Sequence, residues 1–414
     1  MKTPTRYHRA LAAWRPLALF TIMTLAPTLV RAQQLSQMFG NGAGAISQVA
    51  AVQVAQDQFV TAVINSTGNL EVIAWYANLN TKQLVRQGTW VDGPVATGLP
   101  PQYPAIAISS PFALHAGSSG VFTTAAINWS SNALDIIYWK LQPNGTISKI
   151  DETSQHGATA VSIASVYYTQ NGYPQFVTAI RNFSGDLEVS LWHVDPTYGI
   201  ELSGNTAYAG AINAVSIACL QDSNSDVITA VSNSASNLEL IKWFYSGSTV
   251  TRGNTTYTST YAINNVAVAP GIPTFNDPPY PVNAFYTASP DNLTIVSPWN
   301  QYLGLQGSVT TGSAMWLAMA AHNTAAIMVS TPQNPILYDS GGPYSLGVFD
   351  QNNSNQFSQV TGALGPYATT VGIAWVDTSS PNNNIFAVAY RNSYGNLQIR
   401  LWNYLPACSP NCGG

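Results

Sequence analysis

Charged side chains are scarce in this chain of 414 residues. Asp, Glu, Lys and Arg together make up 8% of it, against roughly 25% in typical globular domains. Asn, Ser, Thr, Gln, Tyr and Trp stand in their place. Hydrophobic residues account for 46%, enough for a large core, and this content argues against intrinsic disorder.

Cysteine is almost absent, with three in the whole chain. Cys219 lies inside an apolar strand pattern and is predicted to be a small core residue. Cys408 and Cys412 lie in a short C-terminal tail, residues 406–414. In an oxidising compartment we expect them to form a disulfide, because a metal site would need more ligands than these two.

Long apolar runs are missing beyond the N-terminus. A basic stretch precedes the apolar run Leu17–Val30, and Val30-Arg31-Ala32 has the residue sizes of a signal-peptidase site. Residues 1–32 are therefore predicted to be a cleaved signal peptide. An uncleaved anchor is the alternative, but about 20 clean apolar residues are needed to span a bilayer, and Pro27 interrupts this shorter run. We expect a secreted or periplasmic protein with no membrane span.

Basic charge is lower still once the signal is removed. The remaining 382 residues carry nine basic and 18 acidic side chains, a net charge of −9. Such a chain lacks the positive surface that neutralises phosphates. Nucleic acid and anionic lipid are therefore not expected as partners.

Recognisable catalytic and metal motifs are also absent. The histidines beyond the signal follow no metal-ligand spacing, and Gly117–Gly120 lacks the spacing of a nucleophile elbow. Asp222 and Asp226 offer oxygens at alternate positions, as at the start of a calcium loop. The Gly and the distal Glu of such a loop are missing, so a solvated turn is the default reading and calcium the alternative. No cofactor is predicted.

A repeat governs the rest of the chain. Its core is an alternating strand, a turn built on Asn and Gly, and a second strand that runs from Leu to Trp. Five clear copies end at Trp75, Trp139, Trp192, Trp243 and Trp402, a degenerate copy ends at Trp299, and a weaker one starts at Ala325 without Trp.

Each copy is preceded by a short apolar strand and followed by a polar-apolar stretch. The apolar strands begin near Val49, Pro104, Val161, Val215, Val266, Met315 and Val371. Four short strands repeated seven times are typical of a propeller. Residues 33–405 are therefore predicted to form an all-β, seven-bladed β-propeller with four antiparallel strands per blade.

The chain ends indicate how the ring closes. The last copy runs out after Trp402 with no fourth strand. The segment that starts at Gln34 (QLSQMFG) resembles the fourth strand that starts at Gln356 (QFSQVTG). We therefore expect the N-terminal strand to complete the last blade, which removes an exposed sheet edge.

Most repeated residues have structural explanations. The turn Asn bonds its own backbone while Gly supplies a positive φ. The Leu and the Trp of the second strand point to opposite, buried faces. The carboxylates after that Leu (Glu71, Asp135, Glu188 and Glu239) recur around the ring and form no catalytic pair; Lys140, Arg181 or Lys242 or backbone donors are their expected partners.

Three of the turns carry an aromatic residue that a turn does not need: Trp129, Phe183 and Tyr394. An exposed ring costs solvation unless something packs on it. Sugars present an apolar C–H face with polar edges, which suits a ring flanked by Asn, Ser and Thr. These three residues are the predicted ligand-binding set. The alternative is that the rings fold onto adjacent loops.

The repeated hairpin and the closed ring resemble secreted bacterial or fungal propeller lectins. The resemblance covers the whole mature chain but matches no sugar-binding motif residue by residue. The WD series, the sialidase Asp-box and the kelch double glycine are missing. The resemblance implies a non-catalytic, carbohydrate-binding protein whose partner is a glycan or polysaccharide.

Two other functions stay open. One is a polysaccharide-degrading enzyme of the lyase type, with a pocket around His322 and Tyr338 formed by Pro270–Pro281 and Pro332–Phe357. The other is a protein-binding scaffold or adhesin.

Overall fold

The computed structural model describes the chain from Gln34 to Leu405, with gaps. The described ranges are 34–97, 103–111, 120–166, 174–203, 206–219, 226–246, 249–258, 262–269, 282–289, 293–299, 309–311, 316–322, 325–331, 342–351, 357–380 and 383–405. Their regular structure is β-strand throughout, so the fold is all-β as predicted. Within these ranges no helix is long and apolar enough to cross a membrane. The signal peptide and the tail cysteines Cys408 and Cys412 lie outside the described residues.

Strands that follow one another in the chain pair antiparallel. We call each group of neighbouring paired strands that contains one copy of the repeat a ladder. The N-terminal half contains β1 (Gln34–Ala55), β2 (Gln58–Asn65), β3 (Asn69–Asn78), β4 (Gln83–Pro94), β5 (Ile106–Ser109), β6 (Val121–Ile127), β7 (Ala133–Leu141), β8 (Ile147–Ser165), β9 (Gln175–Asn182), β10 (Asp186–Asp195), β11 (Gly199–Leu202) and β12 (Ala207–Cys219).

The C-terminal half continues the same pattern. It contains β13 (Val227–Asn233), β14 (Leu238–Ser246), β15 (Thr249–Thr258), β16 (Ala262–Ala269), β17 (Val282–Ser289), β18 (Leu293–Trp299), β19 (Val309–Thr311), β20 (Trp316–His322), β21 (Ala325–Thr331), β22 (Gly342–Gln351), β23 (Phe357–Ala368), β24 (Val371–Ser380), β25 (Asn383–Arg391) and β26 (Asn396–Leu405).

Three long strands are each shared by two consecutive ladders, because their first part pairs in one ladder and their second part in the next. The first part of β1 pairs with β26 and the second with β2. In the same way β8 pairs with β7 and then β9, and β12 with β10 and then β13. The described strands therefore form sheets of seven, eleven, four and four strands. These sheets are larger than single blades because the backbone of β1, β8 and β12 runs from one ladder into the next, so the number of seven blades stays a prediction.

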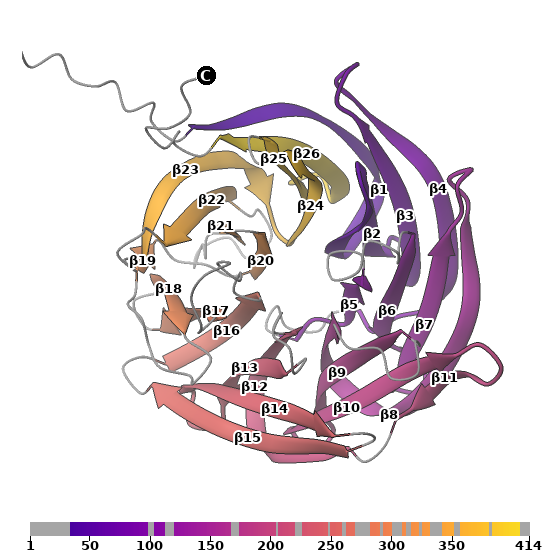
Figure 1. The fold of residues 1–414 in the computed structure, drawn as a ribbon, viewed down its shortest axis with the longest axis vertical. Helices are drawn as coiled ribbons and strands as arrows, with labels where there is room; N and C mark the ends of the chain where they lie inside the picture. Colours follow the sequence, from indigo (N-terminus) through magenta and orange to yellow (C-terminus); the bar gives the residue numbers. More distant parts are fainter. Residues whose placement is uncertain are drawn as a thin grey trace, which may run out of the picture.

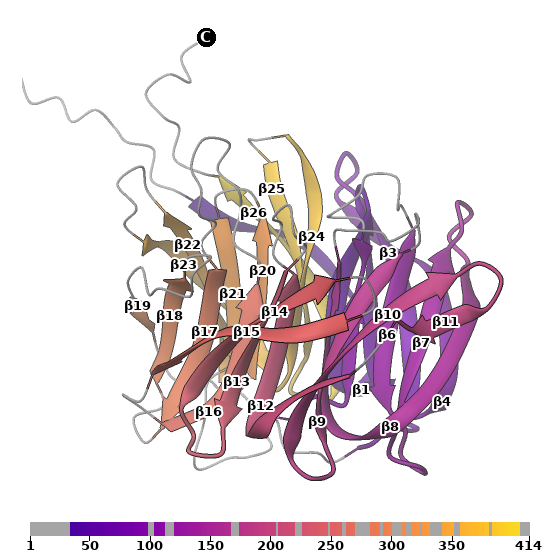
Figure 2. The ribbon, with the colours of Figure 1, turned by 60° about the horizontal axis from the view of Figure 1, so that its bottom comes forward.

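The N-terminal strand pairs with the last strand of the repeat, as the sequence predicts. Gln34 lies opposite Leu405, and the antiparallel pairing extends, with two register shifts, to Ala45 opposite Asn396. Figure 1 shows β1 beside β26, with the ladders arranged around a common centre that β5, β12, β16, β20 and β24 face. In the tilted view of Figure 2 the ladders stand side by side around that centre.

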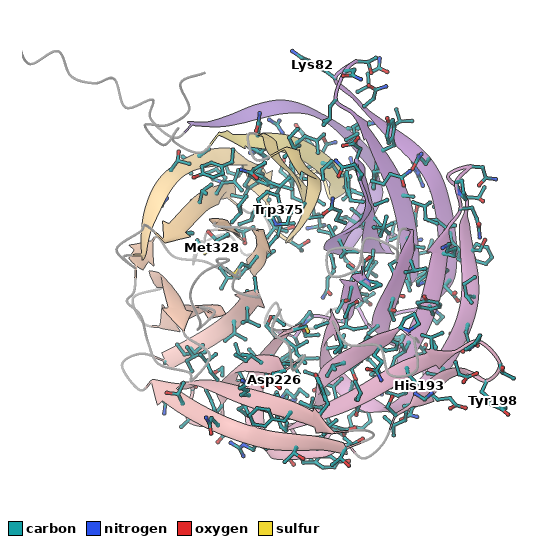
Figure 3. All side chains as sticks on the ribbon, in the orientation of Figure 1. Lys82, His193, Tyr198, Asp226, Met328 and Trp375 are labelled. Carbon is teal, nitrogen blue, oxygen red and sulfur yellow. The ribbon has the colours of Figure 1, made fainter. Side chains whose placement is uncertain are left out.

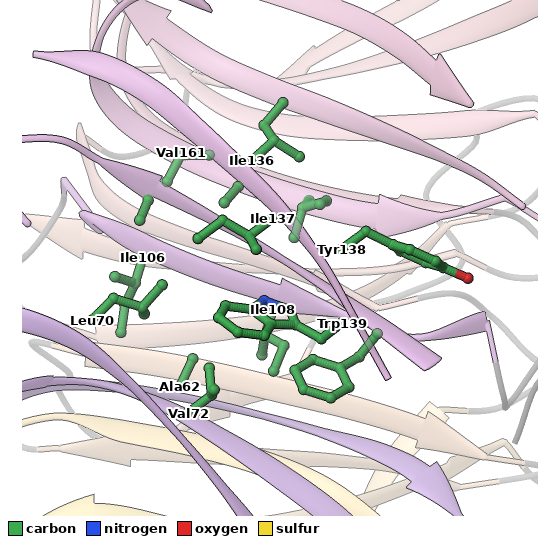
Figure 4. Packing of buried hydrophobic residues seen from close by; sticks show 14 of the residues in the cluster. Ala62, Leu70, Val72, Ile106, Ile108, Ile136, Ile137, Tyr138, Trp139 and Val161 are labelled. Atoms are coloured by element: carbon green, nitrogen blue, oxygen red, sulfur yellow. The ribbon is translucent and has the colours of Figure 1, made fainter. Parts of the chain in front are cut away.

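The Trp of each clear repeat is buried. Trp75, Trp139, Trp192, Trp243 and Trp402 are each at most 4% exposed. In four ladders the Trp lies opposite a Phe across the strand pair. In three of them the rings stack, at centroid distances of 6.5 Å (Phe59–Trp75), 6.1 Å (Phe122–Trp139) and 6.3 Å (Phe176–Trp192). Figure 4 shows Trp139 within such a core, near Ile108 and Ile137. The prediction of Trp as core is confirmed.

The buried indole N–H groups have a repeated partner. Thr61, Thr124, Thr178 and Thr229 accept hydrogen bonds from the Trp of their own ladders at 2.8–3.0 Å. In the last ladder Val388 occupies this position, and Trp402 Nε1–H donates instead to Tyr344 Oη at 3.2 Å. The fold thus satisfies each of these buried donors, as buried polar groups require.

Replacing Thr178 with valine is expected to lower the free energy of unfolding by about 1–3 kcal/mol, because a buried indole N–H loses its acceptor while the side-chain shape is kept. Chemical denaturation measures the change. Thr81→Val at an exposed turn is the control and should change stability by less than about 0.5 kcal/mol. Equal stabilities for the two variants would contradict the role given to this hydrogen bond.

The turn asparagines are structural, as predicted. Asn182 Oδ1 accepts from the Asp186 N–H at 3.0 Å, and Asn392 Oδ1 accepts from Tyr394 and Asn396 N–H groups at 3.0 Å. Gly185 and Gly395 close these turns with φ of 86° and 81°, values that only glycine adopts without strain. The same Asn geometry recurs in the turns at Asn65, Asn128 and Asn233.

Candidate functional site

One face of the molecule carries both the repeat turns and the segments that cross from one ladder to the next. We call it the crossing face and define it by the turns β2–β3, β6–β7, β9–β10, β13–β14 and β25–β26. In each turn a carbonyl accepts from the crossing segment: Gly68 from Val95 at 2.8 Å, Asn132 from Ala158 at 3.0 Å, Gly185 from Ile212 at 2.8 Å, Ser236 from Ile263 at 2.6 Å and Gly395 from Ile46 at 2.8 Å. These bonds hold each turn against the start of the next inner strand.

The three predicted aromatic residues lie at the tips of these turns. Trp129 is 60% exposed, Phe183 61% and Tyr394 87%. The rings therefore do not fold into the core, and each comes from a different ladder. Whether they bind a ligand stays a prediction.

The Phe183 ring is supported from one side by a neighbouring backbone. A Cβ on Gly157, in β8, would lie 1.7 Å from Phe183 Cε2, so only glycine leaves room for this ring. Gly157 lies opposite Ala133 in the preceding ladder. The ring is thus held against that ladder and keeps most of its surface open to solvent. Sequence reasoning missed this support because the glycine lies 26 residues from the ring.

The other two turns are fixed through their backbones. Trp129 N–H donates to Pro94 O at 3.3 Å, and Asn128 forms an isolated bridge with Val95. Tyr394 N–H donates to the side chain of Asn392 at 3.0 Å. These contacts fix the backbone that carries each ring.

Other exposed aromatic residues lie away from the repeat turns. Tyr198 is 76% exposed and lies in the β10–β11 hairpin at the rim, as Figure 3 shows. Trp90, on β4, is 40% exposed and contacts buried Trp139 edge to face, with centroids 6.2 Å apart. The repeat pattern does not mark either position.

The carboxylates Glu71, Asp135 and Glu239 have partners within their own ladders. Glu71 pairs with Arg86 at 2.9 Å and Glu239 with Arg252 at 2.7 Å. Asp135 accepts from Asn128 at 2.8 Å and from Ser154. Glu239 does not take the expected partner Lys242, which pairs instead with buried Asp226 at 2.6 Å, and the contacts of Arg181 are to Ile212 O and Thr159 Oγ1. Pairing with Lys140 stays a prediction.

Titratable groups give no catalytic arrangement on the described part of the crossing face. His193 contacts Ser203 through Nδ1 at 2.9 Å and Glu201 through Nε2 at 3.5 Å, but this group lies on the rim hairpin (Figure 3). Burial raises the pKa of Tyr138 to about 12, which keeps that phenol protonated. Within the described ranges no group of three potential metal ligands occurs.

The remaining predicted pocket and metal residues cannot be placed. Tyr338 and Asp222 lie outside the described residues, as does the side chain of His322. The enzyme alternative and the calcium alternative therefore stay predictions.

The centre of the molecule holds a cavity of about 210 Å³ lined by the inner strands. Its walls are mainly Ala, Val, Ile and Leu. Its polar lining residues are Ser162, Ser216 and Asn265, and Ser162 and Ser216 accept from the Ile217 and Val268 N–H groups of the next inner strand at 3.1 Å. These hydroxyl groups join adjacent inner strands, and the remaining described wall is mainly apolar.

No family model and no curated protein sequence matches the chain. Solved structures do. The SapL1 lectin in complex with alpha methyl fucoside has a TM-score of 0.51 and 13% identity over 78% of this chain and 97% of its own. AofleA from Arthrobotrys oligospora has a TM-score of 0.51 and 8% identity over 82% and 94%. A putative 6-phosphogluconolactonase from Bacteroides uniformis has a TM-score of 0.50 and 11% identity over 76% and 85%.

The chain has a lectin-like all-β fold. At these identities the likeness concerns the fold alone, and the same fold also occurs in a putative lactonase. Function must therefore be argued from the residues of this chain.

Proposed function

We propose that this protein is an extracellular, non-catalytic carbohydrate-binding protein with the fold of a seven-bladed β-propeller. The ladders supply the blades, with β1, β8 and β12 each shared by two of them. The pairing of β1 with β26 supports closure of the ring through the N-terminal strand. Secretion rests on the signal-like residues 1–32.

The observation that carries the proposal is the set of exposed rings on the crossing face. Trp129, Phe183 and Tyr394 occupy the tips of equivalent turns, each at least 60% exposed. An aromatic face with polar neighbours binds the C–H face of a pyranose and leaves its hydroxyls to Ser and Asn side chains nearby. The lectin among the structural neighbours binds a sugar in the same fold, which supports the proposal by analogy.

Replacing Trp129, Phe183 or Tyr394 with alanine is expected to weaken glycan binding by roughly 1 kcal/mol, or about fivefold in Kd, per ring. Folding should be nearly unchanged because the rings are exposed. A glycan array with the wild type identifies the ligand, and calorimetry with the variants measures the loss.

Tyr198→Ala is the matched control, since Tyr198 is 76% exposed, within the range of the three rings, but lies on the rim. This variant should bind like the wild type. Unfolding of the turn variants would show that the rings are structural. A folded wild type that binds no glycan on the array would overturn the proposal in favour of a protein-binding scaffold.

A further inference from the structure

Two of the three aromatic turns also carry an arginine at the same position. Arg181 and Arg391 immediately precede the turn residues Asn182 and Asn392. Both arginines are partly exposed. In the turn that carries Trp129 the corresponding residue is Ile127.

The two arginines make the same contacts in their two ladders. Arg181 Nε donates to Ile212 O at 2.7 Å and Nη1 donates to Thr159 Oγ1 at 2.9 Å. Arg391 Nε donates to Ile46 O at 2.7 Å and Nη1 to Thr369 Oγ1 at 3.1 Å. The hydrogen bonds of Nε and Nη1 therefore hold the plane of each guanidinium in one orientation.

The third nitrogen of each guanidinium faces the turn that carries the ring. A Cβ on Gly185 would lie 3.1 Å from Arg181 Nη2, and one on Gly395 would lie 3.4 Å from Arg391 Nη2. Each glycine lies within two residues of the exposed Phe183 or Tyr394. A fixed cation and an exposed ring thus belong to one short turn.

The fold does not need a charge at this position. In the β13–β14 turn Ser232 Oγ donates to Ile263 O at 2.6 Å, which is the bond that Arg181 makes to Ile212. In the β2–β3 turn the position is Ile64, which has no side-chain donor. A neutral residue is therefore sufficient to build the turn.

Neither charge is neutralised within the described residues. Arg181 and Arg391 bond only neutral acceptors, and Arg181 also lies 5.0 Å from the ring centroid of Tyr103. Arg86 and Arg252, on outer strands, instead pair with Glu71 and Glu239. A partly buried guanidinium bonds a carboxylate more strongly than a neutral acceptor.

We propose that Arg181 and Arg391 make the turn sites of Phe183 and Tyr394 selective for sugars that carry a carboxylate. The ring binds the C–H face of the sugar while Nη2 of the arginine donates to its carboxylate. This inference rests on the proposed function, because it assigns a substrate class to two of the same sites. The Trp129 turn lacks the arginine, so we assign it no preference for sugars that carry a carboxylate.

Binding of matched sugar pairs tests the inference. The probes are oligomers of galacturonate, glucuronate and mannuronate with their methyl esters, and 3′-sialyllactose with lactose. We expect the wild type to bind the acid of at least one pair tenfold or more tightly than its neutral partner. In R181Q/R391Q this ratio should fall to about twofold or less, and R181K/R391K should be intermediate because lysine keeps the charge but loses the fixed plane.

The control is R86Q/R252Q, which removes the same charge from outer strands and should keep the full preference for the acid. Melting temperatures show whether each variant folds, and the acid-to-ester ratio of the wild type needs no variant. If the wild type binds neutral sugars as tightly as acids throughout the panel, the inference is overturned while the proposed function stands. If no glycan binds at all, both are overturned.

Discussion

Replacing Trp192 with alanine is expected to lower the free energy of unfolding by about 3–5 kcal/mol, as truncation of a buried Trp does elsewhere. The ring is 2% exposed, stacks on Phe176 at 6.3 Å and donates a hydrogen bond to Thr178 at 2.9 Å. Its removal leaves a cavity between ladders and an orphaned hydroxyl. Denaturant unfolding monitored by circular dichroism measures the loss.

Phe183→Ala is the internal control because Phe183 lies in the same hairpin but is 61% exposed. The two substitutions should differ in their effects. Trp192→Ala destabilises the protein, whereas Phe183→Ala leaves stability nearly unchanged and weakens glycan binding. Equal destabilisation by both would show that Phe183 belongs to the core.

Deleting residues 34–45 is expected to give a protein that aggregates and melts at a clearly lower temperature. These residues form the half of β1 that pairs with β26, from Gln34 opposite Leu405 to Ala45 opposite Asn396. Their loss exposes the edge of β26, and an unpaired edge is a template for association. Differential scanning calorimetry and light scattering follow the two effects.

A chain that begins at Gln33 is the control, since it lacks only the predicted signal peptide. Adding a synthetic peptide of residues 34–45 to the deleted protein should raise its melting temperature by mass action. A deletion variant that stays monomeric with the melting temperature of the control would refute closure through this strand.

Several features of the fold could be predicted because they depend on local sequence. The Asn and Gly of each turn determine the hairpin, and the Leu and Trp of the second strand (Leu187 and Trp192 in β10) are buried on opposite faces, as predicted. The match between Gln34 and Gln356 predicted the pairing of the N-terminal strand. The number of separate sheets could not be predicted, because continuity of β1, β8 and β12 depends on how far each strand extends.

The partners of the carboxylates could not be predicted without knowing the register of the outer strands. Arg86 lies opposite Trp75 and Arg252 opposite Trp243, in each case next to a register shift in the ladder. Such irregularities re-aim side chains, so the arginine reaches a carboxylate four residues along the partner strand. Aligning the copies of the repeat does not reveal this register shift.

Parts of the candidate site could not be predicted from the sequence either. The exposed rings could be predicted from the turns, but part of their surroundings comes from neighbouring ladders: Gly157 lies beneath Phe183, and Ile212 O accepts from Arg181. The turn sequence RN that contains Arg181 and Arg391 was visible. Its role depends on the finding that, among the residues that the structure describes, neither arginine pairs with a carboxylate.

The shared strands also determine which parts of the molecule open together. A strand that belongs to two ladders cannot leave one without disrupting the other, so hydrogen exchange should divide the described strands into cooperative blocks. One block runs from β24 through β26 and β1 to β4, and another from β5 to β15. Both ends of the described chain lie in the first block. A linear repeat array frays from its two ends independently, whereas here fraying of either end is coupled to the same seven strands.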